Sequence, residues 1–334
     1  MKKYFDEVPL TPFQARYGYN VPDNNYPTNF FVEKMLSRKT IRRFDTESPL
    51  DPKLIEKLVA VAQSAPTSSM LQPWSILAIN TKEQKEKLLT EENAIWFEAP
   101  TNHLTKQDIN GVKRSDVPTS AIIDALKECD TLLVWLVDFT ITDAVINRPD
   151  AYDADPQLLK YRDQVVKLSR ELDMEMRAIT DTIIAAQTFC VAAESLGLGV
   201  MYMGSIKNIE LGPDFNIPSR CIPLFGMAIG WPKSDNLNTW GNFKTTPTAP
   251  TIIKPRLPQE LIFHKGVYNN KSKERLDDER FEKVKEYNQT LVRFYRWHYQ
   301  SWDWFNRVIM RTWRKRNRFL DLCKNHGIFS YIEK

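Results

Sequence analysis

Residues 181–205 read DTIIAAQTFCVAAESLGLGVMYMGS, and this stretch of sequence decides the fold. Its first half is apolar on nearly every side, which predicts a helix buried on several sides instead of one lying on a surface. Gly197 is a natural residue to end this helix, because glycine readily adopts the left-handed conformation that follows many helices. The apolar residues VMYM then predict a strand, so a central helix leads directly into a sheet.

Two further helices are predicted on the N-terminal side. In SPLDPKLIEKLVAVAQSAP (48–66), Asp51 is a good N-cap and Pro52 a good first helical residue, and Pro66 follows the end of the helix. The charged segment TKEQKEKLL (81–89) predicts a short exposed helix. Both helices precede the central one in the chain.

Three more apolar runs predict strands. WSILAI (74–79) and TLLVWLVDF (131–139) are short continuous apolar runs, which are typical of buried strands. PLFGMAIGW (223–231) has the same character. Helices and strands in this order, with helices dominating, predict an α+β fold whose sheet is sandwiched by helices.

We divide the chain into three parts. Residues 1–28 are rich in Pro, Asn and Tyr and are expected to form an extended N-terminal arm that could wrap a partner. Residues 29–270 form the core, with insertions at about 91–120 and 140–170. Residues 271–334 are charged and aromatic and are expected to form a helical C-terminal extension.

Composition excludes several functional classes. The 334 residues carry 46 basic and 42 acidic side chains, and a net charge of +4 is too small for a dedicated nucleic-acid binder. Four scattered cysteines without a CxxC pair, and four histidines without ligand spacing, argue against disulfides and metal and favour the cytoplasm. The longest apolar run, LLVWLV, is too short to span a membrane.

Two basic groups are candidates for binding an anion. The segment SRKTIRRF contains four basic residues, Arg38, Lys39, Arg42 and Arg43, with the hydroxyl of Thr40 among them. In KPRLP, Lys254 and Arg256 flank a proline. Guanidinium forks and backbone amides together can bind a phosphate, although a solvated basic turn is an equally simple interpretation of each group.

A polar turn and a glycine are candidates for contacting a ligand. The turn TSSMLQ places Thr67, Ser68, Ser69 and Gln72 between a helix and a strand, where they can bind a phosphate or a heteroaromatic ring edge. The alternative is a turn that satisfies only its own backbone. Gly204 permits close approach of a ligand to the backbone. Since no nucleotide-binding or catalytic signature occurs, a cofactor is expected to carry any chemistry.

Taken in order, these segments resemble the FMN-dependent nitroreductase family. RKTIRRF is similar to the family's opening basic motif, and residues 48–79 to its next helix, serine turn and strand. Residues 181–208 resemble its central dimer-interface helix and the loop that follows, and IPLFGMAIGWP its last core strand. KPRLP, followed by HKGVY, resembles the larger NADPH-dependent branch of nitroreductases and flavin reductases. Met70, where many members have Asn, fits that branch.

The resemblance implies a nitroreductase-like fold with a mostly antiparallel sheet, an extended helical C-terminal excursion and an entwined homodimer with FMN at the subunit interface. The residues expected to hold the FMN phosphate and ribityl chain are Arg38, Lys39, Thr40, Arg42, Lys254 and Arg256. Those expected to contact FMN from the other subunit are Thr67, Ser68, Ser69 and Gln72. Those expected beside the flavin ring are Tyr202, Met203, Gly204 and Ser205, the last in place of a second glycine.

The aromatic and basic C-terminal region resembles the part of that branch which binds the 2′-phosphate of NADPH. Arg293 and Arg296 are the candidates, and a solvated helix face is the alternative. Basic residues interleaved with aromatic ones also occur in proteins that bind single-stranded nucleic acid. The motifs in the rest of the chain disfavour that interpretation.

The resemblance implies an NAD(P)H-dependent FMN oxidoreductase. Hydride would pass from NADPH or NADH to FMN, and then to a nitroaromatic, quinone or free flavin, in a ping-pong mechanism without a catalytic side chain. Two alternatives stay open. One is a flavin-dependent oxidase or dehydrogenase of a specific metabolite. The other is a non-catalytic binding protein on a nitroreductase scaffold, against which the intact basic motif argues.

Overall fold

The structure is a computed structural model that describes residues 28–90, 121–146, 172–209, 211–233 and 262–268, with positions 13, 148, 160, 161 and 164. The chain divides into two compact units. The first, which we call the arm unit, comprises Met1–Lys39 and Pro247–Thr312. The second, which we call the core unit, comprises Thr40–Thr246 and Trp313–Lys334 and contains the sheet.

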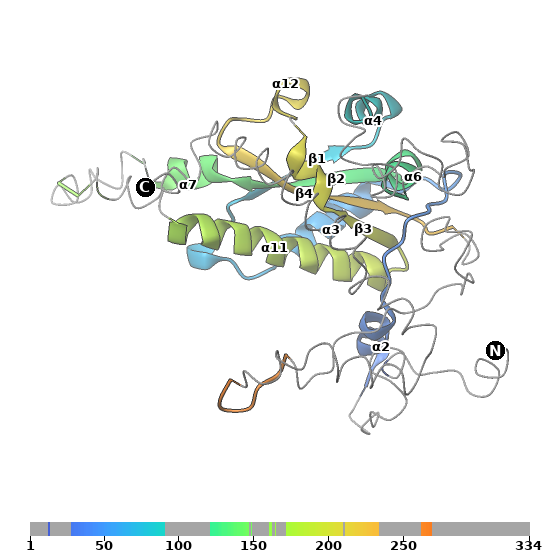
Figure 1. Cartoon of the computed structure of the whole chain (residues 1–334), viewed down its shortest axis with the longest axis horizontal. Coiled ribbons are helices and arrows are strands. Elements are labelled where there is room, and N and C mark those ends of the chain that lie inside the picture. The colour runs from blue at the N-terminus through green and yellow to red at the C-terminus, as the bar shows by residue number, and fades with distance from the viewer. Residues whose placement is uncertain are drawn as a thin grey trace, which may run out of the picture. The chain divides into compact units, whose positions relative to one another are not determined.

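The sheet has four described strands: β1 (Trp74–Ile79), β2 (Thr131–Asp138), β3 (Gly199–Met203) and β4 (Cys221–Gly230). Their order is β1-β2-β4-β3, and each neighbouring pair is antiparallel (Figure 1). The predicted antiparallel sheet is therefore confirmed. Every residue of β2 is buried, as predicted, but β1 is mostly half-buried because it pairs only with β2 among the described strands. The expectation of a buried strand was wrong for β1.

Side chains of β2 alternate between two hydrophobic layers. Leu132, Val134 and Leu136 pack into one layer, and Leu133 and Trp135 into the other. The first layer is closed by α4 (Lys82–Leu88) and α6 (Ala121–Glu128) and the second by α3 (Pro52–Gln63) and α11 (Leu172–Ser195) (Figure 1). This arrangement confirms the prediction of a sheet sandwiched by helices.

Local sequence signals set the ends of these helices. The Asp51 side chain accepts a hydrogen bond from the amide of Lys53, with Pro52 at the start of α3. The α4 helix begins with a capping box between Thr81 and Gln84. These signals act over three residues or fewer, which is why the sequence alone predicted α3 and α4.

The central helix α11 ends as predicted and leaves one of its predicted apolar positions exposed. Gly197 has a φ of 89°, and the amides of Gly197 and Leu198 donate to the carbonyls of Glu194 and Ala193. This is the hydrogen-bond pattern of a glycine-terminated helix. Ile183, however, is 48% exposed, so this chain alone does not bury the helix on all sides.

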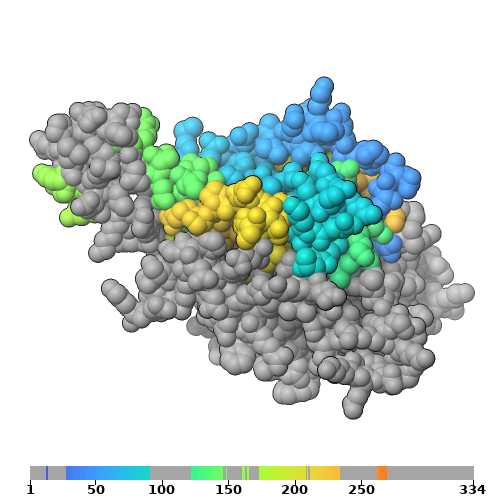
Figure 2. All heavy atoms as spheres, turned by 90° about the horizontal axis from the view of Figure 1, so that it is seen from above, coloured from blue at the N-terminus to red at the C-terminus, as the bar shows by residue number. Residues whose placement is uncertain are grey.

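Shorter elements complete the description. In the core unit they are η1 (Ser68–Met70), α7 (Phe139–Ile146), η4 (Gly204–Asn208) and α12 (Gly212–Phe215). Figure 2 shows α4 (cyan) beside α12 (yellow), where the Lys87 ammonium lies 5.7 Å from the centre of the Phe215 ring. In the arm unit, α2 (Phe30–Ser37) begins at the capping residue Asn29. Within the described segments, no helix has the length and apolar character needed to cross a bilayer.

Candidate functional site

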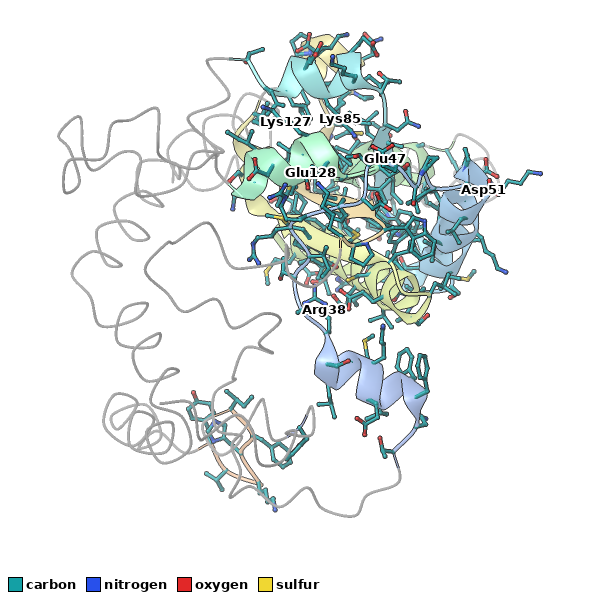
Figure 3. All side chains as sticks on the ribbon, turned by 90° about the vertical axis from the view of Figure 1, so that its right-hand side faces the viewer. Arg38, Glu47, Asp51, Lys85, Lys127 and Glu128 are labelled. Carbon is teal, nitrogen blue, oxygen red and sulfur yellow. The ribbon has the colours of Figure 1, made fainter. Side chains whose placement is uncertain are left out.

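The basic segment, residues 38–43, continues from one unit into the other. Arg38 and Lys39 end the N-terminal stretch of the arm unit, just after α2 (Figure 3). Thr40 and Arg42 belong to the core unit, where the intervening Ile41 donates its amide to the carbonyl of Val200 in β3 at 3.2 Å. The core part of the segment therefore lies along β3, which leads to Gly204.

Close packing against β3 fixes this part of the segment. A Cβ added to Gly199 would lie 2.7 Å from Cγ2 of Ile41, so only glycine leaves room for Ile41 at this distance. Ile41 itself is 7% exposed and belongs to the hydrophobic layer on the α6 side. Thr40 and Arg42, on either side of Ile41, are held by the same contact.

Arg43 is committed to an ion pair inside the core unit. Its guanidinium forms a bidentate pair with Glu128, with its Nε 2.9 Å from both carboxylate oxygens. Glu128 also accepts from the amide of Phe44 at 3.1 Å and from Nζ of Lys233 at 3.0 Å. Burial alone would raise the pKa of Glu128, but the hydrogen bonds from Arg43 and Lys233 outweigh it and lower this pKa. Arg43 is thus an anchor of the segment.

Arg42 provides a partly buried positive charge next to this anchor. Burial lowers the pKa of its guanidinium from 12.5 to about 10, so it stays protonated at neutral pH. Its Nη1 lies 3.5 Å from the carbonyl oxygen of Thr40. A guanidinium shielded from water attracts an anion more strongly than an exposed one. Arg42 is therefore well suited to bind a phosphate.

The serine turn, residues 67–72, is attached to α11 through Asp181. The Thr67 hydroxyl donates to Oδ2 of Asp181 at 2.7 Å, and the amide of Ser68 donates to the same oxygen at 2.9 Å. The amide of Gln72 in turn donates to the Thr67 hydroxyl at 3.0 Å. The bond from the Gln72 amide to the Thr67 hydroxyl is the kind expected for a turn that satisfies its own backbone. The bonds to Asp181 are long-range, and the sequence did not indicate them.

The backbone of the serine turn is unusual because left-handed conformations occur at residues other than glycine. Ser69, Met70 and Gln72 have φ values of 52°, 55° and 46°. Each such residue costs about 1–2 kcal/mol relative to the right-handed conformation. Conformations of this kind cluster at functional sites, where the surrounding structure holds them. Met70 is 81% exposed, so the turn presents an apolar side chain outward.

The end of β3 presents backbone that is open on one side. A Cβ added to Gly204 would meet no atom of the described residues within 4 Å, so packing among these residues does not require glycine there. Met203 is 1% exposed, so its side chain belongs to the core and only its backbone can face a ligand. The Tyr202 hydroxyl donates to Oε1 of Gln187 at 3.2 Å, and the Tyr202 ring lies 5.1 Å from that of Phe225. Ser205 follows in η4 and is half-buried.

Sequence reasoning missed Asp181 and Gln187, which connect two parts of the site to one helix. Asp181 holds the serine turn and Gln187 contacts Tyr202, and six residues of α11 separate them by about 9 Å along the axis. A signal for Asp181 existed. Its spacing places it on the same helix face as the buried residues Ala185 and Phe189, and a carboxylate on a buried face requires partners.

Several predicted residues lie outside the described residues. These are Lys254 and Arg256 of the predicted phosphate pocket, and Arg293 and Arg296 of the predicted NADPH site. Their roles stay predictions. Among the residues that the structure does describe, no group of three or more His, Cys, Asp or Glu side chains could hold a metal ion.

An α+β protein with a partly buried arginine, a clamped polar turn and an open strand end has the elements of a cofactor-binding oxidoreductase. Residues 35–231 match the model of the nitroreductase family, and residues 254–329 match that family's C-terminal domain. The chain therefore belongs to the nitroreductase family, as its motifs predicted.

Named relatives span most of the chain. An FMN reductase (NADPH) of Bacillus subtilis is 27% identical over 271 residues, covering 80% of this chain and 84% of the relative. A Cr(VI) reductase of a Pseudomonas species is 25% identical over 267 residues, covering 79% and 83%. The structure of the NADPH:FMN oxidoreductase of Vibrio harveyi with NAD+ aligns with a TM-score of 0.57 and 21% identity, covering 90% of this chain and all of that one. The structural likeness supports the nitroreductase-like fold.

Proposed function

We propose that the chain is an NADPH-dependent FMN oxidoreductase that reduces a free flavin, nitroaromatic or quinone in ping-pong order. The expected enzyme class and cofactors are confirmed at the level of the family, whose relatives include an FMN reductase (NADPH). The preference for NADPH, the order of binding and the acceptor are our proposal. The relative named Cr(VI) reductase adds chromate to the acceptors worth testing.

The observation that carries the proposal is the open backbone at Gly204. Space beside Gly204, where a methyl group would meet no atom of the described residues within 4 Å, fits a flat ring lying against the end of β3. Amides at this position can donate to the polar edge of such a ring, and donors there favour negative charge on it when it is reduced. The residues present therefore fit a flavin.

The remaining residues have binding roles. Arg42 and Thr40 are proposed to hold the phosphate and ribityl chain, assisted by Arg38, Lys39, Lys254 and Arg256. The serine turn is proposed to bound the ring on another side. When bound, FMN would itself accept the hydride and pass the electrons on, so no acid or base side chain is required. The protein contributes position, charge and exclusion of water.

We place the interface of a homodimer on the uncovered face of α11. Met176 and Ile183 lie on this face and are 58% and 48% exposed in the single chain. Full burial of an exposed side chain of this size contributes about 1.5–3 kcal/mol, and because these two are already half-buried, each contributes roughly half of that. In the dimer, the serine turn of one subunit would contact FMN held mainly by the other. The arm at 1–28 and the extension at 271–334 lie almost entirely outside the described residues, so the wrapping of a partner by the arm and the helical character of the extension stay predictions, as does a cytoplasmic location.

The first experiment measures the cofactor and its reduction. The purified protein should be yellow, contain about one FMN per chain and be bleached faster by NADPH than by NADH in stopped flow. Arg42→Ala should weaken FMN binding roughly 10- to 100-fold, because one charge-assisted hydrogen bond contributes about 1.5–3 kcal/mol. Colourless protein that does not take up added FMN would contradict the proposal.

A matched pair of glycine variants tests the position of the ring. Gly204→Ala should leave the melting temperature unchanged, since the new methyl group meets no atom of the described residues, and it should weaken FMN binding, since the methyl group would occupy the space proposed for the ring. Gly212→Ala is the control, because its methyl group would make an ordinary 3.7 Å contact with the carbonyl of Ile217. Equal FMN affinity in both variants would place the ring elsewhere.

A further inference from the structure

Asp181 is a buried carboxylate that, among the described residues, accepts two hydrogen bonds, both from the serine turn. Its side chain is 4% exposed, and one oxygen, Oδ2, accepts from the Thr67 hydroxyl and the Ser68 amide. We propose that Asp181 is the positioning residue of the flavin site, which sets where the serine turn lies against FMN. This inference rests on the proposed function, because it assumes that the turn contacts the cofactor.

The turn depends on this one oxygen for its attachment to α11. Its backbone–backbone bonds are local: the amides of Met70 and Leu71 donate to the carbonyls of Thr67 and Ser68, at 3.3 Å and 3.1 Å, and the amide of Trp74, the first residue of β1, donates to the carbonyl of Gln72 at 2.7 Å. Among the residues that the structure describes, the hydrogen bonds that join residues 67–72 to an element distant in the sequence are the two accepted by Asp181. Loss of Asp181 therefore frees the turn from α11 without breaking its internal bonds.

Thr67 extends the influence of Asp181 to the far end of the turn. A hydroxyl has one proton to donate, and an ionised carboxylate can only accept. Because the Thr67 proton points to Asp181, the lone pairs of its oxygen are available to the Gln72 amide. The chain of bonds from Asp181 through Thr67 to Gln72 has a fixed direction. Thr67, which the resemblance assigned to FMN contact, thus becomes a positioning residue.

The left-handed residues explain why the turn needs such a clamp. Ser69, Met70 and Gln72 hold positive φ values that residues other than glycine leave readily unless the surroundings hold them. The two Asp181 bonds lie directly before Ser69, and the Thr67 bond ends on Gln72. The clamp therefore encloses the three strained positions. Releasing it lets Ser69, Met70 and Gln72 move away from the geometry that a ligand meets.

Two pairs of variants separate the clamp from simple loss of a side chain. Asp181→Ala and Thr67→Val remove the acceptor and the hydroxyl, whereas Asp181→Asn and Thr67→Ser keep an oxygen at each position. The conservative variants keep the test valid if Asp181→Ala fails to fold. Ser64→Ala is the control, because the Ser64 hydroxyl donates to the carbonyl of Val61 at 2.6 Å and belongs to the end of α3.

The first measurement is hydrogen exchange of the Ser68 and Gln72 amides in the FMN-free protein. The second is FMN affinity by fluorescence titration. Asp181→Ala and Thr67→Val should speed exchange, because each removes two hydrogen bonds of the clamp, and should weaken FMN binding roughly tenfold, because the turn is no longer held in place for the cofactor. Asp181→Asn, Thr67→Ser and Ser64→Ala should stay near wild type. The double variant Asp181→Ala, Thr67→Val should be no weaker than either single one, since the two residues act as a unit.

Three results would overturn the inference. Exchange that is unchanged in Asp181→Ala would mean that the turn does not depend on the carboxylate. Faster exchange with unchanged FMN affinity would mean that the clamp does not serve the cofactor. An Asp181→Asn protein as weak as Asp181→Ala would point to the negative charge instead of the acceptor geometry. Wild-type protein that binds no FMN would remove the proposed function, while the exchange measurement would still decide whether the clamp exists.

Discussion

Two segments of the proposed flavin site are attached to the core in different ways. Residues 40–45 are tied to β3 by the Ile41 amide, to the end of β4 by backbone bonds, and to α6 by the Arg43–Glu128 pair. The serine turn is tied to α11 by one oxygen of Asp181. The first segment is anchored to distant elements by several independent bonds, whereas the second is joined to α11 by one side chain and otherwise bonds only to its own residues and to the adjoining start of β1.

This difference predicts different consequences of mutation. Contacts of the first segment are also contacts of the hydrophobic layer, so breaking them should lower the stability of the whole core unit. Contacts of the serine turn hold a local conformation, so breaking them should change cofactor affinity more than stability. The predictions below test this contrast from the largest expected effect to the smallest.

The largest effect is expected for Glu128→Ala. This change leaves the half-buried cations of Arg43 and Lys233, and the amide of Phe44, without their shared acceptor. We expect the free energy of unfolding to fall by about 2–3 kcal/mol, measured by denaturant unfolding. Glu86→Ala is the control, because its 3.8 Å pair with Lys82 is exposed and contributes under about 1 kcal/mol. Similar losses in both variants would contradict the anchoring role of Glu128.

A smaller loss is expected for Gly199→Ala. The added methyl group would lie 2.7 Å from Cγ2 of Ile41, and overpacking of this kind costs about 1–3 kcal/mol. Because Ile41 adjoins Arg42, FMN affinity should fall together with the melting temperature. Gly204→Ala, by contrast, should lower affinity alone. Gly199→Ala protein with normal stability would show that the first segment is less firmly held than its contacts suggest.

The carboxylates of Asp138 and Glu128 should make the core less stable in acid. Burial would raise the pKa of Asp138, but hydrogen bonds from Ser75, Thr140 and Cys221 lower it below 3.8, and the pKa of Glu128 is held below 4.5. Lowered folded-state pKa values stabilise the protein above the unfolded values, and this stability is lost as pH falls through the folded ones. The melting temperature should therefore drop below about pH 4.5. Glu128→Gln should flatten this dependence; an unchanged slope would remove Glu128 from its cause.

Features set by neighbouring residues could be predicted from the sequence, whereas the long-range attachment of the serine turn could not. The Asp51 cap, the Gly197 helix end and the apolar run of β2 were predictable, because each signal lies within a few neighbouring residues. The clamp was not, because Asp181 lies 114 positions from Thr67. Helix periodicity puts Asp181 on a buried face, but it does not indicate which residue Asp181 binds.

The conformation of the serine turn was hidden for another reason. Left-handed φ values are ordinarily read from glycine, and Ser69, Met70 and Gln72 carry no such signal. The structure shows that the turn is held in strained backbone, which a tertiary contact must maintain.

The smallest effect is expected for Ser69→Gly. Glycine adopts the left-handed φ of 52° without strain, but it also gains freedom in the unfolded chain, so we expect a net stabilisation of only about 0.5 kcal/mol. The same freedom lets the turn leave its geometry, so FMN affinity should fall about two- to threefold, a cost of about 0.5 kcal/mol. Ser64→Gly is the matched control, because the φ of −77° at Ser64 gives glycine no advantage and stability should fall. If Ser69→Gly raises the melting temperature and Ser64→Gly lowers it, and only Ser69→Gly weakens FMN binding, then FMN affinity depends on the strained backbone of the turn. A Ser69→Gly protein that is both less stable and equally able to bind FMN would contradict it.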